Sequence, residues 1–251
     1  MVIMDDEIRL ECEINLPKAQ REPCPIVVLF HGFTGNKDEP HLLAVTQALN
    51  EAGAAVLRAD LYGHGKSGGS FENHTLFKWI GNAMTLMDAA RKMEWSGDLY
   101  LCGHSQGGLL AMLAAGMKRD QVKGVIALAP ALMIPEGARR GRLLGEPFDP
   151  DHVPESLPAW GGLTLNGNYV RVAQTIDVRK VASKYTGPLL LVHGTDDGAV
   201  PAKVSVAAAK YCQGAELHLI EGDGHCFERH LEEMTETVKD WMTRRLAEDE
   251  A

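Results

Sequence analysis

The chain has 251 residues, enough for one large domain or two small ones, and its 45% hydrophobic and 24% charged residues are typical of a folded globular protein. Its formal net charge is −9, and its basic residues gather only in the short groups Arg139–Arg142 and Arg244–Arg245. Nucleic-acid binding needs a basic stripe that neutralises phosphates, so nucleic acid is excluded as an expected partner.

The cysteine content and the lengths of the apolar runs indicate the cellular compartment of the protein. The five cysteines are an odd number with no Cys-x-x-Cys spacing, which argues against a disulfide framework and against a structural zinc site. The acidic N-terminus lacks the apolar core of a signal peptide, and no apolar run approaches the roughly 18 residues of a membrane span. We therefore expect a cytoplasmic protein with no membrane association, no metal and no cofactor; its oligomeric state is left open.

Short apolar runs alternate along the chain with longer segments of helical period. The expected strands are Ile26–Phe30, Ala54–Arg58, Leu99–Cys102, Val125–Leu128, Leu189–Val192 and Leu217–Ile220. The expected helices are His41–Ala52, Thr75–Met93, Val204–Cys212 and Glu228–Leu246. Because most strand segments are continuously apolar, they predict an α/β fold with a mostly parallel sheet and helices on both faces. The alternating segment Ile8–Leu16 is expected to add an antiparallel edge strand.

One stretch, residues 131–187, interrupts this alternation and contains recurrent prolines. A segment of this length between two strands of one sheet is expected to be an insertion that folds separately. We interpret it as a small cap over a core made of residues 1–130 and 188–251. Within the cap, Asn166-Gly167 suits a two-residue type I′ turn and predicts a β-hairpin over Leu163–Val170.

The most informative motif is Gly103-His-Ser105-Gln-Gly107, which follows an apolar strand and precedes a helix of small residues. A strand–turn–helix with this pattern raises the serine hydroxyl above the sheet at a helix N-terminus, which makes Ser105 the predicted nucleophile. The strand Ile26–Phe30 ends in His31-Gly-Phe33-Thr-Gly35, the type of loop that supplies an oxyanion donor. The backbone N–H groups of Phe33 and Gln106 are therefore the predicted oxyanion hole.

Chain order selects the acid and the base of a catalytic triad. Two carboxylates, Asp196 and Asp197, follow the strand Leu189–Val192, and the offset from Val200-Pro201 favours Asp197. Because the order is nucleophile, acid, base, three histidines qualify as the base, and they are His218, His225 and His230. His225 follows a strand within a glycine-containing loop and is the predicted base, whereas His218 in a strand and His230 on the last helix are expected to be structural.

Five motifs together point to a known family. They are His31-Gly-Phe-Thr-Gly35, Asp60-Leu-Tyr-Gly-His-Gly-Lys-Ser67, Gly103-His-Ser-Gln-Gly107, His193-Gly-Thr-Asp-Asp197 and Gly224-His225. With these motifs the chain resembles the α/β-hydrolase superfamily over nearly its whole length, and within it the cinnamoyl/feruloyl esterases of gut and rumen bacteria. The resemblance implies hydrolysis of ferulate and related aromatic esters of plant cell walls, with the cap forming the pocket. Trp160 and Tyr169, the latter expected on the second strand of the hairpin, are candidate walls of that pocket.

Several alternatives remain open at this level. A monoacylglycerol or other small-ester lipase would use the same catalytic residues, and so would a cofactor-free peroxidase or a C–C bond hydrolase. Haloalkane dehalogenases and epoxide hydrolases share the fold but carry aspartate at the position of Ser105. A non-catalytic ligand-binding relative is the alternative outside enzymes, and the presence of all three triad residues argues against it.

Overall fold

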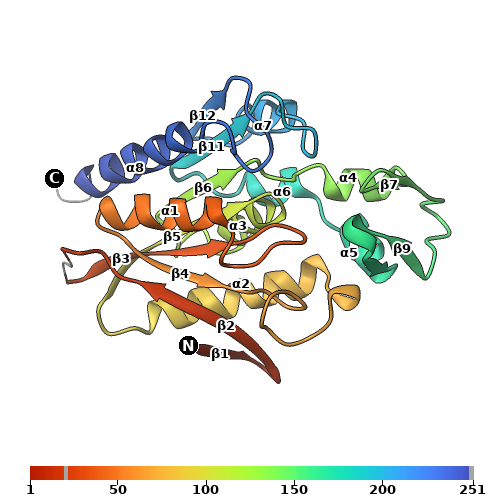
Figure 1. Ribbon diagram of the computed structural model, residues 1–251, viewed down its shortest axis with the longest axis horizontal. Helices are drawn as coiled ribbons and strands as arrows, with labels where there is room; N and C mark the ends of the chain where they lie inside the picture. The colour runs from red at the N-terminus through yellow and green to blue at the C-terminus, as the bar shows by residue number, and fades with distance from the viewer. Residues whose placement is uncertain (20–21, 249–251) are drawn as a thin grey trace.

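The computed structural model describes residues 1–19 and 22–248, and a central sheet organises the chain (Figure 1). In the described part, this sheet has eight strands in the order β1-β2-β4-β3-β5-β6-β11-β12. The strands are β1 (Val2–Asp5), β2 (Ile8–Asn15), β3 (Cys24–Phe30), β4 (Ala55–Ala59), β5 (Ser96–His104), β6 (Gly124–Leu128), β11 (Leu189–Gly194) and β12 (Ala215–Ile220). All six predicted strands are present, because continuous apolar runs such as β3, which is buried at every residue, have no other stable place.

Neighbouring strands from β4 to β12 run parallel, whereas β2 runs antiparallel to β4. The predicted antiparallel strand is thus found as β2, and the shorter β1 pairs outside it at the edge. In a parallel sheet the carboxyl ends of all these strands meet at one edge, where loops can bring distant residues together. The mostly parallel sheet of an α/β-hydrolase fold is confirmed.

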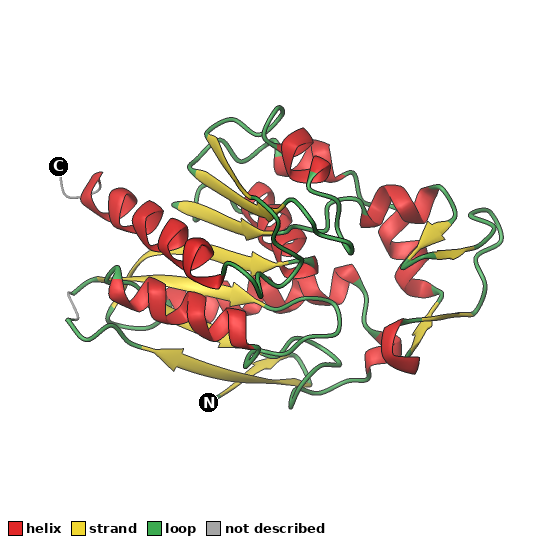
Figure 2. Cartoon of the chain, turned by 45° about the horizontal axis from the view of Figure 1, so that its top comes forward, coloured by secondary structure: helices red, strands yellow, loops and turns green. Residues whose placement is uncertain are grey.

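Helices cover both faces of the sheet (Figures 1 and 2). They are α1 (Pro40–Glu51), α2 (Leu76–Arg91), α3 (Gln106–Met117), α6 (Val178–Ala182), α7 (Lys203–Ala208) and α8 (Leu231–Glu248). Alternate residues of β3 point to opposite faces, so Val27 and Leu29 pack with α1 and α8 while Ile26 and Val28 pack with α2 and α3. The ends of the predicted helices differ from the observed ends by one to four residues. Among the described residues, no helix has the length and hydropathy needed to cross a membrane.

Most of residues 131–187, from Ile134 to Gln174, lie beyond the carboxyl ends of the strands, at one end of the molecule, and the chain then returns to the sheet at α6 (Figure 1). Their elements are α4 (Ile134–Arg139), β7 (Arg142–Leu143), β8 (Glu146–Pro147), β9 (Ser156–Pro158), the 3-10 helix η2 (Trp160–Gly162), β10 (Thr164–Asn166), α5 (Asn168–Gln174) and α6. The last of these, α6, packs on α3 of the main sheet. The segment therefore begins and ends at the central sheet. Between these points it projects over the carboxyl ends of the strands, where the predicted site lies.

The hairpin predicted over Leu163–Val170 is wrong. Gly167 has φ −57° and ψ −18°, which is helical backbone, and the side-chain oxygen of Asn166 accepts the N–H of Asn168 at 2.9 Å. An asparagine that accepts a hydrogen bond two residues on favours the start of a helix, and α5 begins at this point. Tyr169 consequently lies on a helix and not on a strand.

Residues 131–187 do contain antiparallel strand pairs, at other positions. β7 and β8 form a hairpin whose two connecting residues, Leu144 and Gly145, have φ of 54° and 91°, as a type I′ turn requires. β10 pairs with β9, its partner across η2. A leucine at a positive φ carries no sequence signal for a turn, so the pattern could not locate this hairpin.

Candidate active site

Ser105 occupies the turn between β5 and α3. Its backbone has φ 56° and ψ −119°, a conformation that costs free energy in any residue with a Cβ. The turn is held on both sides, because the N–H of Ser105 donates to the carbonyl oxygen of Leu128 at 2.8 Å and Ala131 donates to the carbonyl oxygen of Ser105 at 2.9 Å. The serine, which is 8% exposed, is thus fixed at the N-terminus of α3 on the carboxyl edge of the sheet.

Two glycines make this turn possible. A Cβ on Gly107 would lie 2.3 Å from the carbonyl oxygen of Phe30, and a Cβ on Gly103 would lie 2.1 Å from the carbonyl oxygen of Gly107. Both distances are far below van der Waals contact, so only glycine allows α3 to pack this closely against the end of β3. The spacing of the motif therefore reflects a close approach of two backbones beneath Ser105.

The loop after β3 passes directly beside Ser105. A Cβ on Gly32 would lie 3.2 Å from the Cβ of Ser105. His31 fixes this loop, since its Nδ1 donates to the carbonyl oxygen of Gly32 at 2.7 Å and its Nε2 accepts the N–H of Leu61 at 2.9 Å. His64 donates through Nε2 to the carbonyl oxygen of Phe33. No role was predicted for His64, yet its side chain holds the residue predicted to supply an oxyanion donor.

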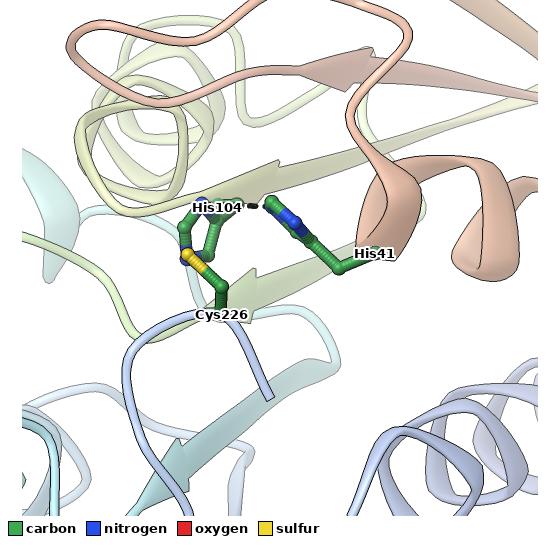
Figure 3. A group of neighbouring side chains, drawn as sticks. All are labelled: His41, His104 and Cys226. Carbon is green, nitrogen blue, oxygen red and sulfur yellow. Dashed lines mark hydrogen bonds between the residues drawn. The ribbon is translucent and has the colours of Figure 1, made fainter. Parts of the chain in front are cut away.

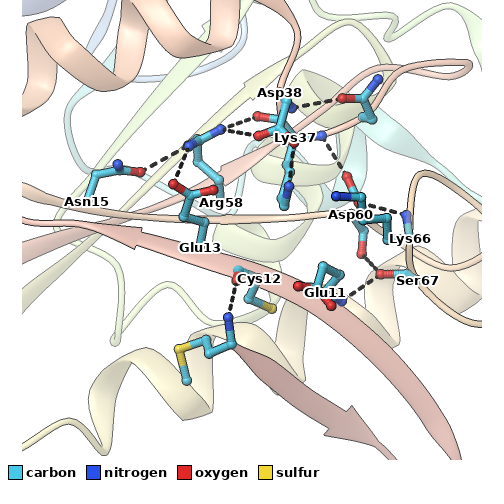
Figure 4. Close-up of polar contacts among 12 residues, drawn as sticks. Glu11, Cys12, Glu13, Asn15, Lys37, Asp38, Arg58, Asp60, Lys66 and Ser67 are labelled. Atoms are coloured by element: carbon cyan, nitrogen blue, oxygen red, sulfur yellow. Dashed lines mark hydrogen bonds and ion pairs between the residues drawn. The ribbon is translucent and has the colours of Figure 1, made fainter.

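A charged network anchors the far end of the same loop (Figure 4). The carboxylate of Asp60 accepts the N–H of Lys37 at 2.8 Å and, through its other oxygen, the N–H of Lys66 at 2.8 Å. Arg58, which is buried, donates to Asp38 at 3.0 Å. Asp60 therefore joins the loop that contains Phe33 to the loop that contains His64, which is a positioning role and not a chemical one.

His225 and Asp197 are hydrogen bonded at the same edge of the sheet. Nδ1 of His225 donates to Oδ2 of Asp197 at 2.7 Å, so the neutral ring carries its lone pair on Nε2. Asp197 also receives Nε2–H of His193 at 3.1 Å and the N–H of Val200 at 2.7 Å. Burial alone would raise the pKa of the Asp197 carboxyl, but these donors outweigh it and hold that pKa well below its usual range.

The other candidates for the acid and the base, Asp196, His218 and His230, lie away from the pair formed by His225 and Asp197. The side chain of Asp196 is 58% exposed and pairs with Arg229 at 3.3 Å. His218 lies in β12 and bonds Glu233 at 3.0 Å, and His230 lies one residue before α8. Of the two adjacent carboxylates, Asp197 alone reaches His225 among the described residues.

The loop that contains His225 meets the residue before Ser105. Nε2 of His104 donates to the carbonyl oxygen of His225 at 2.8 Å, and the two imidazole rings lie 4.7 Å apart between centroids. Residues separated by more than a hundred positions are in this way brought to one edge of the sheet. The structure therefore gathers the predicted nucleophile, base and acid in one place.

The two predicted pocket residues both contact Phe33. The ring of Trp160 lies 6.2 Å from the ring of Phe33, and the ring of Tyr169 lies 5.9 Å from it, both edge to face. Trp160 is 47% exposed, whereas Tyr169 is 1% exposed and donates its hydroxyl to Oε1 of Gln106 at 2.6 Å. Trp160 is thus available to a ligand. Tyr169 is buried, packs against Phe33 and holds the side chain of Gln106 by a hydrogen bond.

A cavity of about 890 Å³ opens between the cap and the loop after Asp197. It is lined by residues of α4 and β7, by Trp160 and by the turn Gly198–Pro201. Its size is in the range of small-molecule sites in proteins. Trp160 therefore has an open space on one side and Phe33 on the other.

Several histidines around this edge are buried and neutral. Burial, together with a smaller contribution from neighbouring histidines, lowers the pKa of His31 to about 3, of His41 to about 4 and of His74 to about 3. In an unfolded chain each ring would titrate at about 6.5. The folded protein consequently binds fewer protons than the unfolded chain at mildly acidic pH.

We expect the free energy of unfolding to fall as the pH is lowered from about 6.5 to about 4. The unfolded state gains protons first in this window, so each of the three rings favours unfolding by about 2 kcal/mol at pH 5. Their sum, about 6 kcal/mol, is comparable with the whole stability of an average domain. Urea unfolding at about pH 7.5 and about pH 5 measures the difference. His74→Phe should reduce it by about 2 kcal/mol, and a His152→Gln control, which changes an exposed ring, should leave it nearly unchanged. Equal stability at the two pH values would contradict the expectation.

Comparisons with known proteins agree with this architecture. The family model described as serine aminopeptidase, S33, matches residues 21–158. The solved structure of Est1E from Butyrivibrio proteoclasticus with ferulic acid bound is 52% identical over 98% of this chain and 99% of that one, with a TM-score of 0.97. A second structure of Est1E is 49% identical over 98% of both chains, with a TM-score of 0.93. A monoacylglycerol lipase from Mycolicibacterium smegmatis is 25% identical over 79% of each chain. The resemblance predicted from the five motifs is confirmed, and the chain belongs to the serine hydrolase family described as serine aminopeptidase, S33, in the α/β-hydrolase superfamily.

Proposed function

We propose that this chain is a serine carboxylic-ester hydrolase that releases ferulic or related hydroxycinnamic acids from their esters. The observation that carries the proposal is 52% identity over nearly the full chain with Est1E, whose structure holds ferulic acid. The local geometry supports it, because Ser105 lies on a strained turn next to the loop that contains His225, and His225 is bonded to Asp197. Membership of a serine hydrolase family agrees with this chemistry.

In the proposed acylation step, the hydroxyl oxygen of Ser105 attacks the ester carbonyl while Nε2 of His225 takes the hydroxyl proton. Asp197 stabilises the imidazolium and keeps Nε2 available, since it accepts the hydrogen on Nδ1. The backbone N–H groups of Phe33 and Gln106 would bind the tetrahedral oxyanion, and losing one such donor typically costs about 3 kcal/mol of transition-state stabilisation. His225 then returns the proton to the leaving alcohol, and an acyl-enzyme remains.

Deacylation would repeat the same steps with water as the nucleophile. His225 removes a proton from water, the hydroxide attacks the acyl carbonyl, and the Ser105 oxygen leaves with that proton. The carboxylic acid is released and the free enzyme is restored. Each proton moves through one imidazole, so the scheme needs no cofactor.

We further propose that residues 131–187 act as a cap that binds the aromatic acid, on a core of residues 1–130 and 188–251. Trp160 supports this role because it is half exposed, packs edge to face on Phe33 and lines the cavity beside the loop after Asp197. A planar cinnamoyl group could stack against this indole beside Phe33. We also propose a cytoplasmic location, which the odd number of cysteines and the lack of a Cys-x-x-Cys spacing in the sequence support.

A substrate screen tests the proposal. We expect kcat/KM for methyl ferulate to exceed that for aliphatic p-nitrophenyl esters of similar size, because only the aromatic acid can use Trp160. In Trp160→Ala, kcat/KM for methyl ferulate should fall about tenfold while that for p-nitrophenyl acetate changes little. Leu163→Ala, which truncates another exposed apolar side chain of the cap, is the matched control and should leave both values unchanged.

The screen also separates the two alternatives. A preference for monoacylglycerols over methyl ferulate would favour the lipase function suggested by the Mycolicibacterium relative. No turnover and no burst of p-nitrophenol at high protein concentration would favour a ligand-binding protein. Either result would contradict the proposed function.

A further inference from the structure

A cluster of three metal-binding side chains lies beside the proposed catalytic base (Figure 3). It consists of His41, His104 and Cys226, whose ligand atoms all lie within 4.8 Å of one another. His41 comes from the first turn of α1, His104 from the end of β5, and Cys226 from the loop after β12. Two of the three residues are buried and Cys226 is half-buried, so the cluster lies at the floor of the site and not on the outer surface.

His104 is already oriented as a metal ligand. Its Nε2–H donates to the carbonyl oxygen of His225 at 2.8 Å, so its lone pair is on Nδ1, which faces Nε2 of His41 at 3.1 Å. Histidine ligands of metals characteristically donate their second ring N–H to a carbonyl or carboxylate, which fixes the ring and the tautomer. The ring of His104 thus already has the tautomer of a metal ligand, and its Nδ1 lone pair becomes available to a cation once His41 no longer donates to it.

The charge around the cluster favours a cation. Both imidazoles are buried, with exposed fractions of 5% for His41 and 3% for His104. Three carboxylates, Glu228, Glu39 and Asp197, act electrostatically on the sulfur of Cys226. The same three carboxylates would attract a divalent cation, whose charge in turn favours the thiolate.

We propose that His41, His104 and Cys226 form a binding site for a borderline-soft divalent cation, with Zn²⁺ as the representative, and that the bound cation slows ester hydrolysis. Two imidazole nitrogens and one thiolate are a donor set typical of zinc, with water in the fourth position. Ligand atoms around one zinc lie roughly 3.3–3.7 Å apart. The two imidazole nitrogens, now 3.1 Å apart, must therefore separate slightly, and any distance to the sulfur above this range, at most 4.8 Å, must shorten. On binding, the thiol releases one proton to solvent and His41 moves its hydrogen from Nε2 to Nδ1.

Inhibition follows from the position of the cluster, and this step rests on the proposed function. The ring of His225 lies 4.7 Å from that of His104, so a bound dication would repel the imidazolium that forms on His225 in the transition state. The cation would also tie Cys226, which follows His225, to His104, which precedes Ser105. Since neither effect touches the acyl pocket, kcat should fall and KM should stay nearly constant.

Cobalt and zinc titrations of the full chain test the site. One equivalent of Co²⁺ should produce a thiolate-to-cobalt charge-transfer band in the near ultraviolet, and Zn²⁺ should abolish it by displacing cobalt. Zn²⁺ should lower kcat for p-nitrophenyl acetate, and a chelator should restore it. In Cys226→Ala the band should be absent, and in both Cys226→Ala and His41→Phe the zinc concentration for half inhibition should rise at least about tenfold.

Two control variants match the change in residue type. Cys212→Ala removes another buried free thiol and His152→Ala removes an exposed histidine, and both should respond to cobalt and zinc as the unmodified chain does. A missing band, a band that persists in Cys226→Ala, or equal zinc inhibition with and without Cys226 would overturn the proposal. If the chain hydrolyses no ester, the proposed function fails, and the cobalt band still decides whether the metal site exists. If the chain hydrolyses esters but shows no cobalt band, the metal site fails and the proposed function stands.

Discussion

Ser105→Ala should lower kcat for methyl ferulate by about 10⁶-fold while the protein folds normally. The side chain supplies the attacking oxygen, and no neighbouring hydroxyl is positioned on the strained turn to replace it. The variant retains the Cβ of Ser105 and the backbone bonds to Leu128 and Ala131, so the turn itself should persist. Steady-state kinetics measure the loss, and circular dichroism with a thermal midpoint measures the fold.

A covalent label separates loss of the nucleophile from general damage. A fluorophosphonate should modify the unmodified chain once, as seen by mass spectrometry, and should leave Ser105→Ala unlabelled. Ser183→Ala, a serine at the end of α6, is the matched control and should label and turn over normally. Activity of Ser105→Ala close to that of the unmodified chain would refute the choice of nucleophile.

The layered core could be predicted from the sequence because each strand carries its own signal. β3, β4, β6 and β11 are buried along their full length, and apart from Arg58 and His193 they contain no polar side chain, as expected of strands covered on both faces. The helices follow from their periodic apolar positions, as in α8, where Met234, Val238 and Trp241 form one buried stripe. The positions of these elements therefore did not depend on knowing the tertiary structure.

The cap was harder to predict because its short elements depend on contacts from elsewhere. Asn166-Gly167 has the local preference of a hairpin turn, but the same asparagine can also start a helix, and packing of α5 decided the outcome. Tyr169 was predicted to lie on a hairpin strand, whereas it lies on α5, is buried and donates its hydroxyl to Gln106. Local sequence gives no means of choosing between these two structures.

The candidate site shows the same contrast. The residues of the predicted triad each follow a strand, and parallel strands bring their carboxyl ends together, so motif order was enough to group them. The cluster of His41, His104 and Cys226 has no such order. Its members come from three elements with no repeated spacing, and each is an unremarkable histidine or cysteine in the sequence. Such a cluster becomes visible only in three dimensions.

Asp197→Asn should lower kcat by about 10⁴-fold, as the equivalent change does in a triad protease, with KM nearly unchanged. One side-chain oxygen of residue 197 accepts the N–H groups of Ala199 and Val200, and asparagine would keep its oxygen there. The amide NH₂ would then face Nδ1 of His225, donor against donor. The ring would have to move its hydrogen to Nε2, which removes the lone pair that accepts the Ser105 proton.

Asp196→Asn is the decisive control because it makes the same chemical change one residue away. Asp196 is exposed and pairs with Arg229 at the surface, where such a pair contributes about 0–1 kcal/mol at most. Its replacement should leave kcat within about twofold and the thermal midpoint almost unchanged. Because Asp197 is held ionised by donors that outweigh its burial, the two variants should differ at every pH at which the protein is folded. If Asp196→Asn were the damaging change, the bond between Asp197 and His225 would have to be structural and the acid would have to be assigned anew.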